Sequence, residues 1–272
     1  MTTVDFDYVR HYVRDQAAIV LEPGKEYLVE SRLQTLARKE NIASIDELVR
    51  QLRASPQNGL HRKVVDAMTT NETSFFRDIH PFETLKKSIL PELMARRGQE
   101  RKLNFWCGAA STGQETFSVL MTIAEHFPEL LKWDFKYIAT DLCKEVLARA
   151  QAGRFSQLEV NRGLPAALLV KHFTRQGTDW EFTESLRQRV DFREMNLVKD
   201  WPLLPPLDIV FLRNVLIYFE IDTKKVILGK IRRLLRPGGY LLLGGAETTF
   251  GVDDAFERVV LDKTTCYRVK QA

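Results

Sequence analysis

The residues best placed to carry chemistry lie in one stretch, 102–118, with the sequence KLNFWCGAASTGQETFS. Its first part, Leu103 to Cys107, is a short apolar run that predicts a buried strand, and the small residues 108–113 follow it. Apolar residues then recur from Phe117 onward at the spacing of a helix. A tight turn of small residues lets backbone N–H groups at a helix N-terminus approach a ligand closely. The stretch predicts a ligand site at the carboxyl end of a strand; the alternative is an ordinary strand-to-helix turn.

A carboxylate at the end of the next predicted strand narrows the class of ligand. Residues 135–140 predict that strand and Asp141 ends it, where an acid can bind the ribose hydroxyls of a nucleoside. The dinucleotide fingerprint G-x-G-x-x-G is absent, since the turn contains only Gly108 and Gly113. The spacing to Asp141 also exceeds the roughly 20 residues of that fingerprint. These features favour a nucleoside ligand without a cradled pyrophosphate, and S-adenosylmethionine (SAM) fits better than NAD.

Segment 69–78, TTNETSFFRD, has an unusual composition for a linker. It combines polar residues, two aromatic residues and Arg77, whereas a plain linker is richer in Gly, Ser or Pro. We interpret it as a segment that folds over a ligand and presents Arg77. The alternative is a cap and hydrophobic staple for the helix predicted from His80.

Polar residues also follow two later predicted strands. Asn196 lies at the end of one, and Arg213 and Asn214 end the other. Polar residues directly after a core strand lie at the ligand-binding edge of an open sheet. Asn196 could bond an adenine edge or simply cap a turn. Tyr218 could orient a substrate through its hydroxyl or be a core aromatic residue.

Residues 1–75 predict only helices, and therefore a separate small helical domain. The helix predicted at 25–39 has four basic residues along or beside it: Lys25, Arg32, Arg38 and Lys39. They form either a solvated face or a basic surface that docks an acidic helix of a partner. We take Arg32 and Arg38 as the candidate docking residues.

Residues 76–272 alternate strands with helices and end in a predicted antiparallel pair, which indicates an α/β fold with a doubly wound sheet. Around 154–192 the alternation is interrupted. Strand-like runs at 180–183 and 188–192 predict a small antiparallel hairpin inserted in the sheet domain. The sequence RPGG at 236–239 is a strong turn signal after the last long helix.

Composition excludes several classes of protein. The 272 residues, 44% hydrophobic and 28% charged, are typical of a globular chain of one or two domains. A net charge of +4 does not by itself indicate a nucleic-acid partner, and an acidic protein partner is equally compatible with it. Three cysteines without a C-x-x-C suggest free thiols in a reducing compartment and no metal site. Neither a signal peptide nor a membrane span is indicated, so we expect a cytoplasmic protein, and a monomer.

Five motifs in order resemble the CheR family of chemotaxis receptor methyltransferases: TTNETSFFRD, WCGAASTGQETFS, ATDL, RNVLIYF and LRPGGYLLLGGAET. The resemblance covers nearly the whole chain. It implies a class I methyltransferase fold with a small β-subdomain and an N-terminal helical domain. It also implies methylation of glutamate side chains on cytoplasmic chemoreceptor helices, with SAM as donor and S-adenosylhomocysteine as product. The cofactor contacts that it implies are Asn71, Thr73, Arg77, Glu115, Asp141, Asn196, Leu197, Leu212, Arg213 and Asn214.

The chain departs from the family pattern in two places. Gln114, Thr116 and Phe117 replace Glu, Pro and Tyr of the family's G-E-E-P-Y-S run, and Cys107-Gly108 replaces the usual Ser-Ala. The loop between Phe173 and Val190 also looks shorter than in members that bind a receptor C-terminal pentapeptide. We therefore expect an enzyme that is independent of such a tether.

The residue types suit methyl transfer to a carboxylate. A glutamate acceptor is already ionised at neutral pH, so no general base is needed. The protein must align and desolvate the carboxylate, and the planar guanidinium of arginine pairs with it bidentately. We expect Arg77 and Arg213 to do this, with Tyr218 orienting the substrate; Arg77 could instead contact the carboxylate of the cofactor.

Four other functions remain to be weighed against this one. A methyltransferase for another substrate is disfavoured by RNVLIYF and by the helical domain. A docking module without activity is disfavoured by the presence of Arg77, Asp141 and Arg213. The missing glycine fingerprint argues against an NAD-dependent oxidoreductase. A nucleic-acid methyltransferase would need a stronger basic field or a base-flipping motif.

Overall fold

The computed structural model describes residues 2–22, 24–54 and 59–270, and they form two compact units. The first contains the described residues up to Thr70 together with Tyr218–Lys224. The second contains Asn71–Ile217 and the described residues from Lys225 onward.

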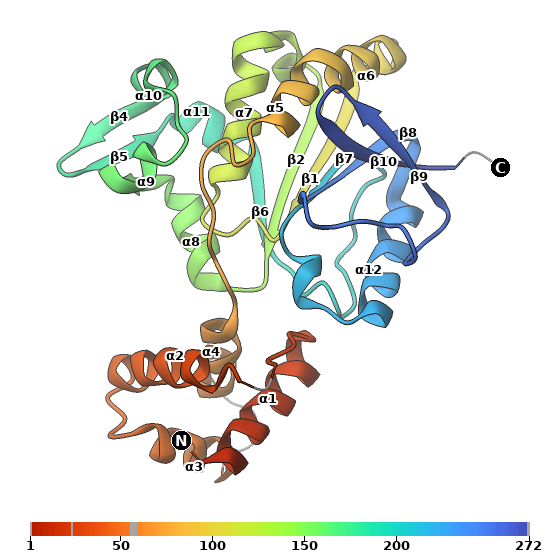
Figure 1. Cartoon of the computed structure of the whole chain (residues 1–272). Helices are drawn as coiled ribbons and strands as arrows, with labels where there is room; N and C mark the ends of the chain where they lie inside the picture. Colours follow the sequence, from red (N-terminus) through yellow and green to blue (C-terminus); the bar gives the residue numbers. More distant parts are fainter. Residues whose placement is uncertain (1, 23, 55–58, 271–272) are drawn as a thin grey trace. The chain divides into compact units, whose positions relative to one another are not determined.

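The first unit is built around four helices: α1 (Thr3–Ala17), α2 (Glu26–Lys39), α3 (Ile45–Ala54) and α4 (Gly59–Met68) (Figure 1). Side-chain caps define two of the helix starts. The Thr2 hydroxyl accepts the Asp5 N–H before α1, and the Ser44 hydroxyl accepts the Glu47 N–H before α3. The apolar stripes of the helices meet in one core that includes Val9, Leu33, Leu48 and Val64.

A seven-stranded sheet organises the second unit, in the order β6-β2-β1-β7-β8-β10-β9. Its strands are β1 (Lys102–Gly108), β2 (Asp134–Asp141), β6 (Val190–Glu194), β7 (Leu207–Leu212), β8 (Leu235–Leu243), β9 (Phe256–Leu261) and β10 (Thr264–Val269). The first five are parallel to one another, and β10 runs antiparallel between β8 and β9. The strand order therefore reverses between β1 and β7, so the carboxyl ends of these strands are where an open α/β sheet binds its ligand.

The connecting helical segments are α5 (His80–Thr84), η1 (Leu85–Ile89), α6 (Leu90–Arg97), α7 (Gln114–His126), η2 (Pro128–Lys132), α8 (Lys144–Ala152), η3 (Leu216–Tyr218) and α12 (Ile221–Leu234). Residues of α5 to α7 pack on one sheet face in a core that includes Phe82, Phe105, Phe117 and Phe211. The neighbouring strand residue Trp106 points to the opposite face, as the alternation of a strand requires, and its ring meets that of Trp201.

The inserted subdomain is a separate three-stranded antiparallel sheet, ordered β3-β5-β4, that projects from one side of the unit (Figure 1). It comprises β3 (Arg154–Ser156), α9 (Gln157–Asn161), α10 (Ala166–His172), β4 (Phe173–Gln176), β5 (Asp179–Phe182) and α11 (Glu184–Arg187). The predicted fold class is confirmed. One strand differs from the prediction, because residues 190–194 pair with β2 in the large sheet instead of completing the hairpin.

The RPGG sequence also behaves differently from a simple helix stop. It lies within β8, where residues 236–239 bulge out opposite the single residue Asp208. Gly238 takes a φ of 74°, which glycine adopts without steric cost.

Candidate active site

The turn between β1 and α7 has the tight backbone that its small residues predict. Ala109 and Ser111 have φ angles of 53° and 52°, and Gly113 caps α7 with a φ of 93°. A Cβ added to Gly108 would lie 2.7 Å from the Leu212 side chain and 3.0 Å from the Trp106 ring. The absence of a side chain at Gly108 therefore lets the end of β1 pack closely against Leu212 and the Trp106 ring. The turn begins directly after this residue.

Asp141 ties this turn to the end of β2. Its side chain is buried, and the two carboxylate oxygens accept the backbone N–H groups of Ser111 (2.8 Å) and Cys143 (2.9 Å). These two bonds fix the carboxylate at the carboxyl end of β2, beside the β1–α7 turn. An acid at this place in an open α/β sheet suits a pair of ligand hydroxyls, as on a ribose.

Segment 71–78 lies across the same turn and is held by three kinds of contact. The Ser111 hydroxyl donates to the Asn71 carbonyl (2.9 Å), and the Phe76 N–H donates to the Ser118 hydroxyl in α7 (2.9 Å). The Phe75 ring packs edge-on against Phe155 of the β-subdomain. The segment is thus fixed over the turn, while α5, whose N-cap residue is Ile79, has no side-chain cap.

Arg213 joins this segment to α7. Its side chain is 1% exposed and forms ion pairs with Glu115 (2.5 Å) and Asp78 (2.7 Å), while a further N–H donates to the Arg77 carbonyl. Glu115 is also largely buried, with 13% of its side chain exposed. The two predicted residues Arg213 and Glu115 therefore contact each other directly, through a buried charge pair.

The Arg77 side chain is separate from this pair. It is half-buried and donates to the Glu72 carbonyl at 3.1 Å. Glu72 in turn forms an ion pair with Arg162 near the β-subdomain. Among the described residues, Arg213 is thus paired with carboxylates, whereas Arg77 forms no ion pair with one.

The Cys107 thiol contacts the same cluster without nucleophilic character. Its Sγ lies 3.5 Å from a Glu115 carboxylate oxygen. Burial, and to a lesser extent the Glu115 charge, raise the pKa of Cys107 well above its usual value. A thiol in this state stays protonated at neutral pH and is a poor nucleophile.

Glu247 is a structural centre of the site that the sequence reasoning missed. One carboxylate oxygen accepts the N–H groups of Val215, Leu216 and Ile217, and the other accepts those of Asn214 and Gly244, at distances of 2.6–3.3 Å. The loop after β7 is thus fixed to the end of β8 through one side chain. No periodicity marks this residue; the only sequence signal was an acid after paired glycines in GGAET.

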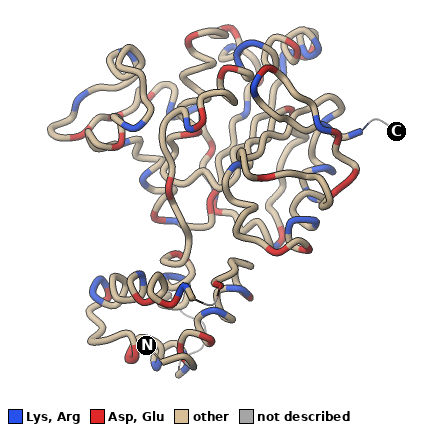
Figure 2. The backbone as a smooth tube through the Cα atoms, viewed as in Figure 1, with Lys and Arg blue, Asp and Glu red and all other residues tan. Residues whose placement is uncertain are grey.

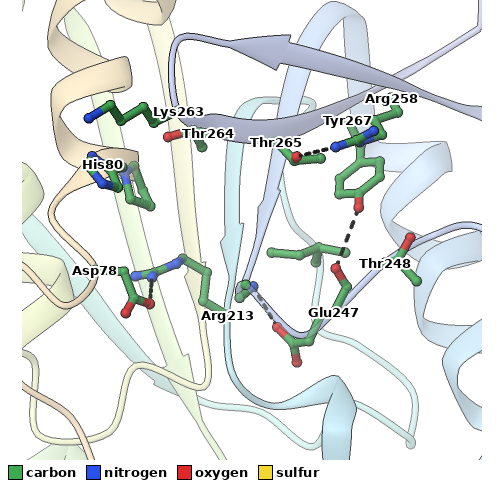
Figure 3. A pocket seen from close by; sticks show the side chains of 14 residues that line it. Asp78, His80, Arg213, Glu247, Thr248, Arg258, Lys263, Thr264, Thr265 and Tyr267 are labelled. Atoms are coloured by element: carbon green, nitrogen blue, oxygen red, sulfur yellow. Dashed lines mark hydrogen bonds and ion pairs between the residues drawn. The ribbon is translucent and has the colours of Figure 1, made fainter.

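A pocket of about 470 Å³ opens at the carboxyl end of β8, next to Arg213 (Figure 3). Its lining comes from the start of α5 and the turn before it, the end of β7, the end of β8 with its following loop, and the β9–β10 hairpin. The hairpin side chains form one edge of the pocket and Glu247 lies at the opposite edge. The pocket therefore adjoins the Arg213 cluster on the side away from β2.

The other predicted residues take varied positions. Asn196 follows β6, where its side-chain oxygen accepts the Val198 N–H, and Leu197 beside it is buried. Leu212 is fully buried at the end of β7. Tyr218 belongs to the helical unit, where its carbonyl accepts the Val20 N–H. Thr73 is half-buried in segment 71–78. Roles for these residues stay predictions.

Within the described ranges, no group of three or more His, Cys, Asp and Glu side chains could hold a metal ion. In the same ranges, no helix combines the length and apolar character needed to cross a membrane.

Comparison with known proteins agrees with this geometry. Residues 4–69 match the family described as CheR methyltransferase, all-alpha domain, and residues 71–265 match CheR methyltransferase, SAM binding domain. The chain is 40% identical over 271 residues to Chemotaxis protein methyltransferase Cher2 of Pseudomonas putida, and 41% identical to Chemotaxis protein methyltransferase 1 of Pseudomonas aeruginosa. Each alignment covers 98% of both chains. The chain belongs to the CheR family of SAM-dependent chemotaxis protein methyltransferases.

Proposed function

We propose that the enzyme transfers a methyl group from SAM to glutamate side chains on the cytoplasmic helices of chemoreceptors. The products are γ-glutamyl methyl esters and S-adenosylhomocysteine, and the reaction serves sensory adaptation in the cytoplasm. The observation that supports this most is the connected cluster at the carboxyl edge of the sheet. There the two acids Glu115 and Asp141, segment 71–78 and Arg213 are tied together around the β1–α7 turn.

The residues present fit the cofactor by the chemistry of their donors and acceptors. Asp141 is buried at the end of β2, where an acid can bind ribose hydroxyls, and the Asn196 amide is placed after β6, which two strands separate from β7. Glu115 lies in the first turn of α7, and its carboxylate can accept a hydrogen bond from the ammonium group of the cofactor in addition to its ion pair with Arg213. When bound, SAM supplies a methyl group activated by the positive sulfonium.

The protein's part in the reaction is then to remove water from the acceptor carboxylate and to align it with the methyl group. A glutamate carboxylate is ionised at neutral pH, so no residue needs to take a proton from it. Arg213 already binds two carboxylates, which leaves Arg77 as the better arginine to pair with the acceptor or with the cofactor's carboxylate. We assign Arg213 to positioning, because it fixes Asp78 and segment 71–78 against α7.

The test is methyl transfer from labelled SAM to receptor cytoplasmic fragments, scored as base-labile methanol. Label on the wild-type fragment, lost when the acceptor glutamate is changed to alanine, would establish a carboxyl methyl ester. Absence of label despite measured SAM binding would reject the acceptor class. A label stable to base would reject the ester.

The β-subdomain supports independence from a receptor pentapeptide. Strands β4 and β5 are joined through only Gly177 and Thr178, so the hairpin has little loop with which to hold an added peptide. We expect no measurable binding of the receptor C-terminal pentapeptide by calorimetry, and equal methylation of receptor fragments with and without it. Saturable binding of the peptide would refute this.

The structure bears differently on the two docking candidates in α2. The Arg32 guanidinium donates to the carbonyls of Met68 and Thr69 and to the Thr70 hydroxyl, so it holds the end of α4. Arg38 is exposed, and no ion pair joins it to another described residue. Both signs of charge are spread along the helical unit, so single residues have to be tested (Figure 2).

Arg38→Glu is therefore the cleaner test of docking. We expect it to raise the KM for the receptor fragment about threefold to fivefold, more at low salt, with SAM affinity unchanged. Arg50→Glu on α3 is the matched control, since Arg50 is 75% exposed and bound only to Glu47 of its own helix. Equal KM values for Arg38→Glu and wild type would remove α2 from the docking surface.

A further inference from the structure

The pocket beside Arg213 has a basic rim. Lys263 and Arg258 come from the β9–β10 hairpin, and His80 is the first residue of α5 (Figure 3). All three residues are exposed. The rim thus places the cationic side chains of Lys263 and Arg258 beside an opening at the ligand-binding edge of the sheet.

The carboxylates that line the pocket are already engaged. Asp78 is paired with Arg213, and both oxygens of Glu247 accept backbone N–H groups. In the part of the chain that the structure describes, Lys263 has no carboxylate partner, and Arg258 donates only to the neutral Thr265 hydroxyl at 3.2 Å. Neither carboxylate of the lining therefore forms an ion pair with Lys263 or Arg258.

Exposed apolar residues are close in the chain to the residues of this rim. Phe250 is 87% exposed on the loop that continues from Thr248, and Ile79 is 45% exposed beside His80. Val260 is 58% exposed and follows Arg258 by two residues, so both lie on the same face of β9. A small free anion gains no binding energy from exposed apolar side chains. An amphipathic polypeptide that carries an acidic side chain matches both the positive charge and the apolar residues.

We propose that this pocket binds a second acidic side chain of the acceptor segment, next to the glutamate that is methylated. Lys263 and Arg258 then determine specificity for acceptor segments with neighbouring acids. The pocket volume of about 470 Å³ is ample for such a side chain. This inference rests on the proposed function, because it assumes that a polypeptide glutamate is the acceptor.

The test measures steady-state methylation of a receptor fragment by the full-length wild-type enzyme and by Lys263→Glu. We expect the KM for the fragment to rise about tenfold, with kcat within about twofold and a larger effect at low salt. Lys136→Glu is the matched control, because Lys136 is exposed near the amino end of β2, at the opposite edge of the sheet. Unchanged affinity for S-adenosylhomocysteine would show that the cofactor site is intact in both variants.

A second fragment, with the acids that flank the acceptor changed to glutamine, completes a double-mutant cycle. The wild-type KM should rise on this fragment, and Lys263→Glu should add no further increase. Equal KM values for Lys263→Glu and wild type, or independent effects of the two changes, would overturn the proposal. Inhibition of the wild type by acetate, with flanking acids without effect, would make the pocket a free-anion site and also overturn it. If the wild type labels no fragment, the proposed function itself fails.

Discussion

Arg213→Met is expected to lower the free energy of unfolding by about 3–5 kcal/mol, because it removes one partner of a buried ion pair and leaves the other uncompensated. Most of this cost comes from Glu115, whose side chain is 13% exposed, whereas that of Asp78 is 56% exposed and can be solvated. Methionine retains part of the volume of the arginine stem, so the change mainly reports the lost charge.

The same variant should lose most of its SAM affinity. Arg213 holds Glu115 of α7 together with the Arg77 carbonyl and the Asp78 carboxylate, so its removal loosens the end of segment 71–78 against α7. Urea unfolding and calorimetric titration with S-adenosylhomocysteine measure the two effects. Arg193→Met is the control, because its ion pair with Asp191 lies at the surface and should be worth less than about 1 kcal/mol.

A double variant separates charge from packing. Glu115→Gln combined with Arg213→Met leaves no uncompensated buried charge, and we expect it to recover part of the stability that Arg213→Met loses. It should not recover cofactor affinity, since both positioning contacts are gone. A double variant less stable than the single one would contradict the assignment of the cost to a bare Glu115 carboxylate.

The local patterns of the sequence predicted the frame of the site. The strand, small-residue turn and helix at 102–118 are encoded by neighbours in the chain, and so is Asp141 at the end of its strand. Alternation of strands and helices was sufficient for the fold class. Residues 188–192 were assigned to the inserted hairpin, although Asn196 was also placed at the end of a strand at the ligand edge. The pairing of 190–194 with β2 shows that the hairpin assignment was wrong, and this pairing depends on segments far apart in the chain.

The partners within the site could not be predicted for the same reason. Arg213 and Asp78 are 135 residues apart, and Glu247 is 33 residues from Asn214. The sequence indicates that Arg213 lies at the ligand edge of the sheet, but it does not show that Glu115 already pairs with this arginine. An arginine in such an ion pair positions other residues, whereas an unpaired arginine can bind a substrate carboxylate. Arg32 is a similar case, since its contacts with the end of α4 depend on how the helices pack.

Glu247→Gln is expected to release the loop after β7. Five backbone N–H groups converge on the carboxylate. A glutamine can accept with only one of its two terminal atoms, and its NH₂ group would face N–H donors that then have no acceptor. The cost should be about 2–4 kcal/mol, felt mainly as local opening of residues 214–217.

Hydrogen exchange measures this opening directly. The amides of Val215 and Leu216 should lose protection in Glu247→Gln by about 30-fold or more, while amides of β1 stay close to wild type. The Glu247 carboxylate is also packed closely against Gly244. A Cβ added to Gly244 would lie 2.7 Å from both the Asn214 side-chain nitrogen and a Glu247 carboxylate oxygen. Glu257→Gln is the control, since Glu257 is exposed on β9.

Because the released loop directly follows Arg213, methyl transfer should fall with the lost protection. Full activity in a variant whose loop amides exchange freely would mean that the order imposed by Glu247 serves folding alone.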